Sequence, residues 1–258
     1  RLLKFAASFF GDDEIVLVIT DITRLNSLED MRKEFVGNVS HELRTPLTVM
    51  RGYIETLQDS SDNSAAVERA FEQMANQVNR MQALADDLML LSRLEAEGPI
   101  AKLESVNLHK LLATIVAEAE VLSGGVHKLN LTCPDSIEVS SQGDSLRSAF
   151  SNIVFNAVHH NPKGATVDIQ AQQHADNITV SIKDDGVGID AAEVPRITER
   201  FYRGDNSRNS STGGTGLGLA IVKHSLNQCG GDLSISSRLG YGATFICRLP
   251  VVTHQPTK

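Results

Sequence analysis

The feature that most constrains the fold is a stripe of apolar residues with helical spacing in the first third of the chain. Apolar residues recur mostly every three or four positions from Leu25 to Leu57, and again from Val67 to Leu91. This period places them on one face of a helix. The polar residues 59–64 (DSSDNS) between the two runs favour a turn and offer helix N-caps. The sequence therefore predicts two long helices joined by a short loop.

Two such helices favour an antiparallel hairpin. Because a hairpin alone buries little surface and both stripes have coiled-coil spacing, we expect two copies to form a dimeric four-helix bundle. A solitary hairpin packed on the rest of the chain is the alternative.

The segments on either side of the hairpin have other patterns. Residues 14–20 (EIVLVIT) are a β-branched run, and the strand they predict is either the end of an upstream domain or a tail. The long polar stretch at 190–213 indicates a functional lid or disorder. The rest of the chain predicts helices at 108–119, 144–160 and 217–228 and strands at 128–133, 137–140, 167–171, 178–183, 233–237 and 244–249. The predicted fold class is α+β, a helical hairpin followed by an α/β sandwich domain.

Composition and charge exclude several classes of function. The 24 Lys and Arg against 32 Asp and Glu give a net charge of −8, which argues against a protein that coats nucleic acid or an anionic membrane. Cys133, Cys229 and Cys247 lie far apart, so neither a disulfide scaffold nor a zinc ribbon is expected, and a reducing compartment fits best. Apolar runs are too short to span a bilayer. Because the chain begins with Arg1 rather than Met, we interpret it as a piece of a longer protein.

One histidine of the first predicted helix has an unusual setting. His41 lies two residues from both Val39 and Leu43, so at about 100° per residue it points away from the apolar stripe. Thr45 shares its face, and Pro46 predicts a bend in the helix. A zinc site of the HExxH kind is excluded because the second histidine is missing. Taken alone, a surface histidine without a role is the simpler interpretation.

Two glycine clusters indicate a phosphate ligand. Residues 184–188 (DDGVG) end a predicted strand, and residues 213–219 (GGTGLGL) open a predicted helix. Glycine lets the backbone approach a ligand closely, and a helix N-terminus presents free N–H groups to phosphate. The dinucleotide fingerprint, the P-loop and the HRD and DFG motifs of Ser/Thr/Tyr kinases are all missing from the sequence. Either cluster alone is equally consistent with a turn.

Two asparagines share one face of an otherwise apolar predicted helix. Asn152 and Asn156 are four residues apart, and Asn is unfavourable there unless it is hydrogen-bonded or bound to a ligand. They predict either a buried polar network or oxygen ligands for a hard cation such as Mg²⁺. His159 and His160 follow, and since adjacent helical positions do not face each other we interpret them as pocket walls rather than a metal pair.

Six motifs follow one another along the chain, and together they identify a family. They are VSHELRTPLT at 39–48, NIVFNAVHHNP at 152–162, DDGVGI at 184–189, ERFYR at 199–203, GGTGLGLAIVK at 213–223 and GYGATF at 240–245. This series resembles the sensor histidine kinases of two-component signalling over about residues 25–250, and in particular those of phosphate regulons. The resemblance implies a sensor remnant of PAS type with its linker at 1–24, a dimerising phosphotransfer hairpin of HisKA type at 25–98, and an ATP-binding domain of the Bergerat (GHKL) type at 99–258.

The resemblance also implies roles for single residues. His41 would accept the phosphoryl group, Glu42 would take its proton, and Thr45 would orient water for dephosphorylation of a partner. Asn156 would hold Mg²⁺, and Asp184 would accept the adenine amino group. The implied ATP pocket consists of Asn152, Asn156, His159, His160, Asp184, Gly186, Gly188, Ile189, Phe201, Arg203, Gly214, Gly216, Leu217, Gly218 and Thr244. At 159 and 160, where this chain has two histidines, many relatives carry Lys and an aromatic residue.

The function implied by the resemblance is an ATP- and Mg²⁺-dependent histidine autokinase. It would act as a homodimer, pass its phosphoryl group to an Asp of a response-regulator receiver domain, remove that group again, and serve a phosphate response. Residues 97–101 would be the mobile linker between the two catalytic parts. No nucleic-acid partner is expected. The chain would be the cytoplasmic portion of a bacterial inner-membrane protein, anchored through parts outside it. An ATPase clamp of the gyrase and Hsp90 type and a degenerate kinase scaffold are the alternatives.

Overall fold

The computed structural model describes residues 1–258 except 11–13, 60–63, 97–103, 142, 205–213 and 252–258. The expected linker at 97–101 and most of the loop at 59–64 lie outside the described residues, as does the end of the polar stretch from 205 onward. The chain forms two compact units, Arg1–Met81 and Gln82–Lys258, and each is described by itself. None of the described helices is long and apolar enough to cross a membrane.

The first unit begins with a β-hairpin. Strand β1 (Leu3–Phe10) pairs antiparallel with β2 (Glu14–Asp21), so the predicted strand at 14–20 is confirmed and has a partner that the sequence did not reveal. β1 has the sequence LKFAASFF, without one β-branched residue, and this explains why it was missed.

Helix α1 (Thr23–Asp59) follows directly, because Asp21 caps its first turn. The Asp21 carboxylate accepts hydrogen bonds from the backbone N–H and the hydroxyl of Thr23, at 3.0 and 2.6 Å. These bonds lower the pKa of Asp21, the side-chain bond most. Helix α2 (Ser64–Ala96) completes the predicted helical hairpin, and its C-terminal residues belong to the second unit.

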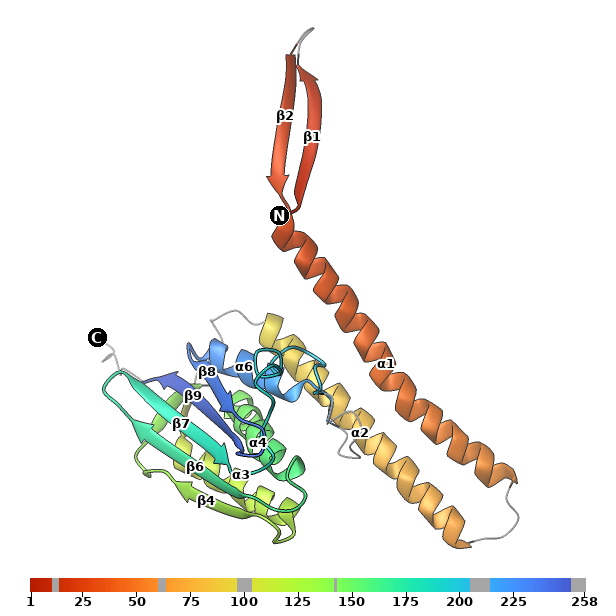
Figure 1. Ribbon diagram of the computed structural model, residues 1–258, viewed down its shortest axis with the longest axis vertical. Helices are drawn as coiled ribbons and strands as arrows, with labels where there is room; N and C mark the ends of the chain where they lie inside the picture. The colour runs from red at the N-terminus through yellow and green to blue at the C-terminus, as the bar shows by residue number, and fades with distance from the viewer. Residues whose placement is uncertain (11–13, 60–63, 97–103, 142, 205–213, 252–258) are drawn as a thin grey trace. The chain divides into compact units, whose positions relative to one another are not determined.

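The second unit contains a five-stranded sheet in the order β4-β6-β7-β9-β8 (Figure 1). β4 and β6 run parallel, and the other neighbours are antiparallel. A separate pair joins β3 and β5. The strands are β3 (Glu104–Asn107), β4 (Lys128–Thr132), β5 (Glu138–Ser141), β6 (Thr166–Gln173), β7 (Asn177–Asp184), β8 (Asp232–Ser237) and β9 (Ala243–Pro250). All six predicted strands of this unit are confirmed within two residues at each end, and the four-residue β3 was missed.

Helices α3 (Leu108–Ser123), α4 (Gly143–His159) and α6 (Gly218–Gln228) share one apolar core with this sheet. Alternate residues of β6 and β7 are buried, including Ile169 and Val180, while polar residues such as Gln170 and Ser181 stand between them. One face of the sheet is therefore apolar and packs on the helices. The predicted α+β fold, a helical hairpin followed by an α/β sandwich, is confirmed.

Candidate functional site

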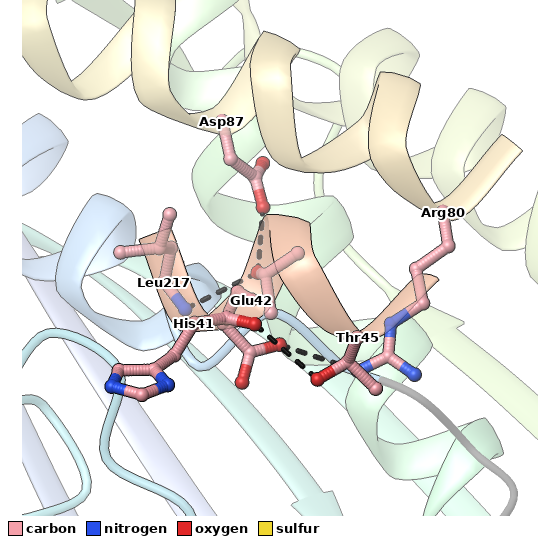
Figure 2. A network of polar contacts seen from close by, with 7 residues as sticks. His41, Glu42, Thr45, Arg80, Asp87 and Leu217 are labelled. Atoms are coloured by element: carbon pink, nitrogen blue, oxygen red, sulfur yellow. Dashed lines mark hydrogen bonds and ion pairs between the residues drawn. The ribbon is translucent and has the colours of Figure 1, made fainter. Parts of the chain in front are cut away.

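His41 lies in the middle of α1, and its side chain is exposed, as its position relative to the apolar stripe predicted. One turn further on, the hydroxyl of Thr45 donates a hydrogen bond to the carbonyl oxygen of His41 at 3.3 Å. Pro46 is buried within the same helix. The histidine, the adjacent carboxylate and the threonine hydroxyl are thus presented together on one segment of α1 (Figure 2).

The carboxylate of Glu42 is contacted by Arg80, a residue that no sequence motif indicated. Arg80 of α2 donates to Glu42 across 3.3 Å, and the side chains of Arg80 and Glu42 are 31% and 29% exposed. This pair links the two helices of the hairpin beside the exposed His41. A partly exposed pair contributes about 0–1 kcal/mol to stability, so its value lies in orienting the carboxylate. Because the two residues are 38 positions apart, no local pattern could have revealed it.

In the second unit, Asp184 ends β7 with its carboxylate buried, only 6% exposed. The N–H of Gly186 donates to its Oδ1 at 3.0 Å. Burial raises the pKa of Asp184 more than the hydrogen bonds from Gly186, Asn161 and Ala243 lower it. A buried carboxylate at a strand end, fixed by backbone N–H groups, is suited to accept a hydrogen bond from a ligand.

Two glycine motifs that are distant in sequence meet around Asp184. Gly242 has a φ of +83°, and a Cβ there would overlap the Asp184 carbonyl oxygen and lie 2.7 Å from its carbonyl carbon. Gly188 has a φ of +67°, and a Cβ there would lie 2.8 Å from the carbonyl carbon of Arg238. Only glycine allows this close approach in these backbone conformations. The DDGVGI and GYGATF segments therefore pack directly against each other.

The second glycine cluster opens α6 next to the asparagine face of α4. A Cβ on Gly218 would overlap the amide oxygen of Asn152 and lie 3.1 Å from its Cγ. Leu217 is fully buried and anchors the start of α6. Gly216, with a φ of +71°, packs against Phe201, whose N–H donates to the Gly216 carbonyl oxygen at 2.8 Å. The N-terminus of α6 thus contacts Phe201 of the polar stretch on one side and Asn152 of α4 on the other.

Asn156 is the residue for which the sequence predicted a cation ligand. It is half-buried, and among the described residues its amide makes no hydrogen bond. Asn152 instead donates to the Ser148 carbonyl oxygen at 2.9 Å. No cluster of three or more His, Cys, Asp or Glu occurs in the described part of the chain. One amide oxygen without a carboxylate cage fits Mg²⁺ held mainly by waters and substrate phosphates.

The remaining residues of the predicted pocket have varied surroundings. Although His160 is an exposed residue, desolvation of its ring, together with the neighbouring His159 and Arg203, lowers its pKa. The Ile189 N–H donates to the Ser237 hydroxyl at 2.8 Å, which ties the end of the DDGVGI segment to β8. Thr244 lies in β9 opposite Lys183, next to the end of β7, and Gly214 is exposed.

The C-terminal part of α2 makes polar contacts with the rest of the second unit that the sequence did not reveal. The Thr215 hydroxyl donates to the Asp87 carboxylate at 2.8 Å and accepts from the Leu217 N–H at 3.3 Å. Burial raises the pKa of Asp87. Glu95 forms an ion pair with Arg200. Gln228 donates a hydrogen bond to the Leu94 carbonyl oxygen at 2.7 Å. The α2 residues in these contacts are Asp87, Leu94 and Glu95.

Comparison with known proteins finds a family model for the segment around His41 and another for the segment around Asp184. Residues 31–97 match the model of the His Kinase A (phospho-acceptor) domain, and residues 141–253 match that of the histidine kinase-, DNA gyrase B- and HSP90-like ATPases. The chain is 46% identical over 95% of its length to the phosphate regulon sensor protein PhoR of Pseudomonas aeruginosa. The chain belongs to the sensor histidine kinases. The corresponding protein of Haemophilus influenzae is 33% identical over 97% of the chain.

The chain spans 56% and 59% of the lengths of these two relatives. Solved histidine kinases share its fold. ThkA in a complex with the response regulator TrrA superposes over 97% of this chain and 75% of its own, with a TM-score of 0.68 and 18% identity. AdeS of Acinetobacter baumannii covers 83% of this chain and 98% of its own, with a TM-score of 0.64 and 20% identity. His41 lies within the range that matches the phospho-acceptor model, and the five-stranded sheet lies for the most part within the range that matches the ATPase model.

Proposed function

We propose that this chain is an ATP-dependent autokinase that phosphorylates His41 and transfers the phosphoryl group to an Asp of a response-regulator receiver domain. The observation that carries the proposal is the exposed His41 beside the Glu42–Arg80 pair, within the segment that matches the phospho-acceptor model. The division of the chain at residues 24 and 98 belongs to the proposal, and the matched ranges 31–97 and 141–253 support it.

The chemistry follows from the side chains present. An unprotonated ring nitrogen of His41 attacks the γ-phosphorus of ATP, so an N–P bond forms while the bond to the bridging oxygen breaks and ADP leaves. The proton on the attacked ring passes to the carboxylate of Glu42. Arg80 holds this carboxylate in place at 3.3 Å. Removal of the proton keeps the phosphorylated nitrogen from carrying a positive charge that would promote the reverse reaction.

The pocket of the second unit would hold ATP at both ends. Asp184 accepts the adenine amino group, and Gly186, Gly188, Ile189 and Thr244 form the surrounding wall. Free N–H groups around the start of α6 face the triphosphate, with Gly214, Gly216, Leu217 and Gly218 in this segment. The other side of this pocket would be lined by His159 and His160, which lie at the end of α4, and by Phe201 and Arg203, which lie within the polar stretch at 190–213.

Asn156 would hold Mg²⁺, with Asn152 beside it on the same face of α4. When bound, Mg²⁺ neutralises the charge that develops on the phosphate oxygens. A single amide ligand leaves most coordination positions to water and to phosphate. This matches the preference of Mg²⁺ for sites shared with its substrate.

Thr45 supports a second, phosphatase activity. Its hydroxyl lies one helical turn from His41, where it would orient a water molecule toward the phosphorylated Asp of a receiver. We therefore expect Thr45→Ala to retain autophosphorylation and to lose receiver dephosphorylation. Unchanged dephosphorylation by this variant would contradict the role.

The partners proposed are a second copy of the chain and a receiver domain. Exposed apolar residues on the hairpin support dimerisation, since they need a covering surface: Leu25, Met31, Val36, Leu47, Ile54, Phe71 and Val78 are each at least 47% exposed. One structural neighbour is described in a complex with a response regulator. The similarity to two phosphate regulon sensors supports a phosphate response. We also propose that the chain is the cytoplasmic portion of an inner-membrane protein, which fractionation of the full-length protein tests.

Incubation with γ-labelled ATP and Mg²⁺ tests the kinase assignment. The chain should take up label that is lost in acid and kept in base, as a phosphoramidate is. His41→Gln should abolish the uptake, whereas His174→Gln, at another exposed histidine, should retain it. Equal labelling of His41→Gln would refute the assignment, and steady ATP hydrolysis without labelled protein would favour an ATPase clamp. Chase of the labelled chain against a panel of receiver domains then identifies the acceptor.

A further inference from the structure

Asn161 is a buried residue that joins two segments of the proposed nucleotide pocket, α4 and residues 184–187. It is 4% exposed and follows the C-terminal end of α4. Its Nδ2 donates to the Ala157 carbonyl oxygen at 2.8 Å and to Oδ1 of Asp184 at 3.4 Å. Its Oδ1 accepts from the Val187 N–H at 2.8 Å. One amide therefore connects α4 with both ends of the segment from Asp184 to Val187.

The backbone of the DDGVG segment packs closely on this amide. A Cβ on Gly186 would overlap the side-chain amide of Asn161, so the backbone of the DDGVG segment lies directly on it. The Asp184 carboxylate receives the Gly186 N–H and the Asn161 amide on the same oxygen, Oδ1. Two donors on one oxygen fix the plane of a carboxylate, because rotation about χ2 would break both bonds.

His127 and Ser123 hold the backbone of Asn161 from the opposite side. His127 Nε2 lies 2.8 Å from the Asn161 carbonyl oxygen. Since that oxygen only accepts, Nε2 carries the proton. In the neutral ring Nδ1 is then an acceptor, and it lies 3.0 Å from the Ser123 hydroxyl, which also receives the His127 N–H at 2.8 Å. Ser123 ends α3, so this chain of bonds runs from α3 to the pocket.

We propose that Asn161 is a positioning residue that sets the base selectivity of the nucleotide pocket. By fixing the Asp184 carboxylate and the Val187 N–H, it presents an acceptor at the place where a purine carries an exocyclic amino group. A 6-oxo purine has a carbonyl there, which cannot donate to a carboxylate. His127 and Ser123 act through Asn161. The inference rests on the proposed function, in which Asp184 recognises the adenine of ATP.

Calorimetric titration of the full chain with ATP and with ITP, in Mg²⁺, tests this role. The wild-type chain should prefer ATP at least tenfold, as expected for a hydrogen bond to a charged acceptor. Asn161→Ala should bring this ratio close to one by weakening ATP and leaving ITP within about twofold, since the bonds to the triphosphate are untouched. His127→Ala should reduce the ratio less, and it keeps the proposal testable should Asn161→Ala fail to fold.

The chain provides a matched control. Asn130 also donates to an aspartate, to Oδ1 of Asp168 at 2.8 Å, on the paired strands β4 and β6. Asn130→Ala removes a bond of the same kind outside the pocket, and the ATP to ITP ratio should stay at its wild-type value. An equal loss of selectivity in this variant would assign the effect to general destabilisation and overturn the proposal.

The pH dependence of ATP affinity is a second measurement, which a purely structural role of Asn161 would not change. The bond from Asn161 opposes the effect of burial on the pKa of Asp184. Asn161→Ala should therefore shift the fall in ATP affinity on acidification to higher pH. Asp184→Asn distinguishes the proposed adenine pocket from the positioning role of Asn161. If it leaves ATP selectivity unchanged, the proposed pocket is wrong; if it abolishes selectivity while Asn161→Ala and His127→Ala do not, only the positioning role is overturned.

Discussion

Two glycines in the loop between β8 and β9 allow the packing around Asp184 to be measured against a matched control. Gly240 and Gly242 have nearly the same left-handed backbone, with φ of +80° and +83°. A Cβ on Gly240 meets nothing within 4 Å, whereas a Cβ on Gly242 would overlap the Asp184 carbonyl oxygen and lie 2.7 Å from its carbonyl carbon. Alanine at either position incurs the same backbone strain, and only Gly242→Ala adds a steric conflict with the pocket.

The magnitudes follow from these two effects. Left-handed backbone costs a residue with a Cβ about 1–2 kcal/mol, so Gly240→Ala should lower the free energy of unfolding by that amount. Overpacking adds about 1–3 kcal/mol, which gives about 2–5 kcal/mol for Gly242→Ala. In a unit of this size the extra 1–3 kcal/mol corresponds to a further fall in Tm of roughly 2–12 °C.

Urea unfolding followed by far-UV circular dichroism, with ATP titration of each variant, measures both consequences. Because the conflict at Gly242 is with the backbone of Asp184, Gly242→Ala should also lose ATP affinity, while Gly240→Ala should keep it. Equal destabilisation of the two variants, or normal ATP binding by Gly242→Ala, would refute the close approach of the two motifs and the reasoning built on it.

Three further predictions concern the Arg80–Glu42 pair, the buried Asp87 carboxylate and the order in which the cysteines react. Arg80→Ala should change the free energy of unfolding by no more than about 1 kcal/mol, because its pair with Glu42 is partly exposed, but should slow autophosphorylation in a rapid-quench assay; an unchanged rate would exclude the orienting role. Burial raises the pKa of Asp87, so the folded state binds the proton more tightly and stability should decrease as pH rises from the unfolded value of 3.8 through the raised folded value. Tm against pH should show this loss in the wild type and less of it in Asp87→Asn; identical profiles would contradict the burial of Asp87. Iodoacetamide at pH 8 should modify the half-buried Cys133 before Cys247, whose pKa burial raises to about 12, and peptide mapping that finds the reverse order would contradict the packing of β9.

Much of the fold was predictable because it depends on local periodicity. The helical hairpin and most strands follow from apolar spacing, and the exposure of His41 follows from its angle to the stripe. The strands that were missed carry little local signal: β1 has no β-branched residue, and β3 has four residues. The predicted domain boundaries and the roles of the predicted pocket residues stay predictions.

The supporting residues of the site could not be predicted because their partners are distant in the sequence. Arg80 acts on a residue 38 positions away, and Thr215 meets Asp87 across 128 positions. Asn161 lies within the second of the six motifs, but its contact with Asp184 spans 23 positions. A single sequence indicates which residue types favour a chemistry, whereas the orientation of those residues depends on contacts that only the folded chain contains.

Mapping the phosphorylated residue tests the central claim most directly. Trypsin releases residues 34–44 (EFVGNVSHELR), in which His41 is the only histidine and Ser40 the only hydroxyl residue. After incubation with γ-labelled ATP and Mg²⁺, the label should appear in this peptide, remain in base and disappear in acid. Label that survives acid and maps to Ser40, or label carried by any other peptide, would contradict the assignment of His41 as the phospho-acceptor.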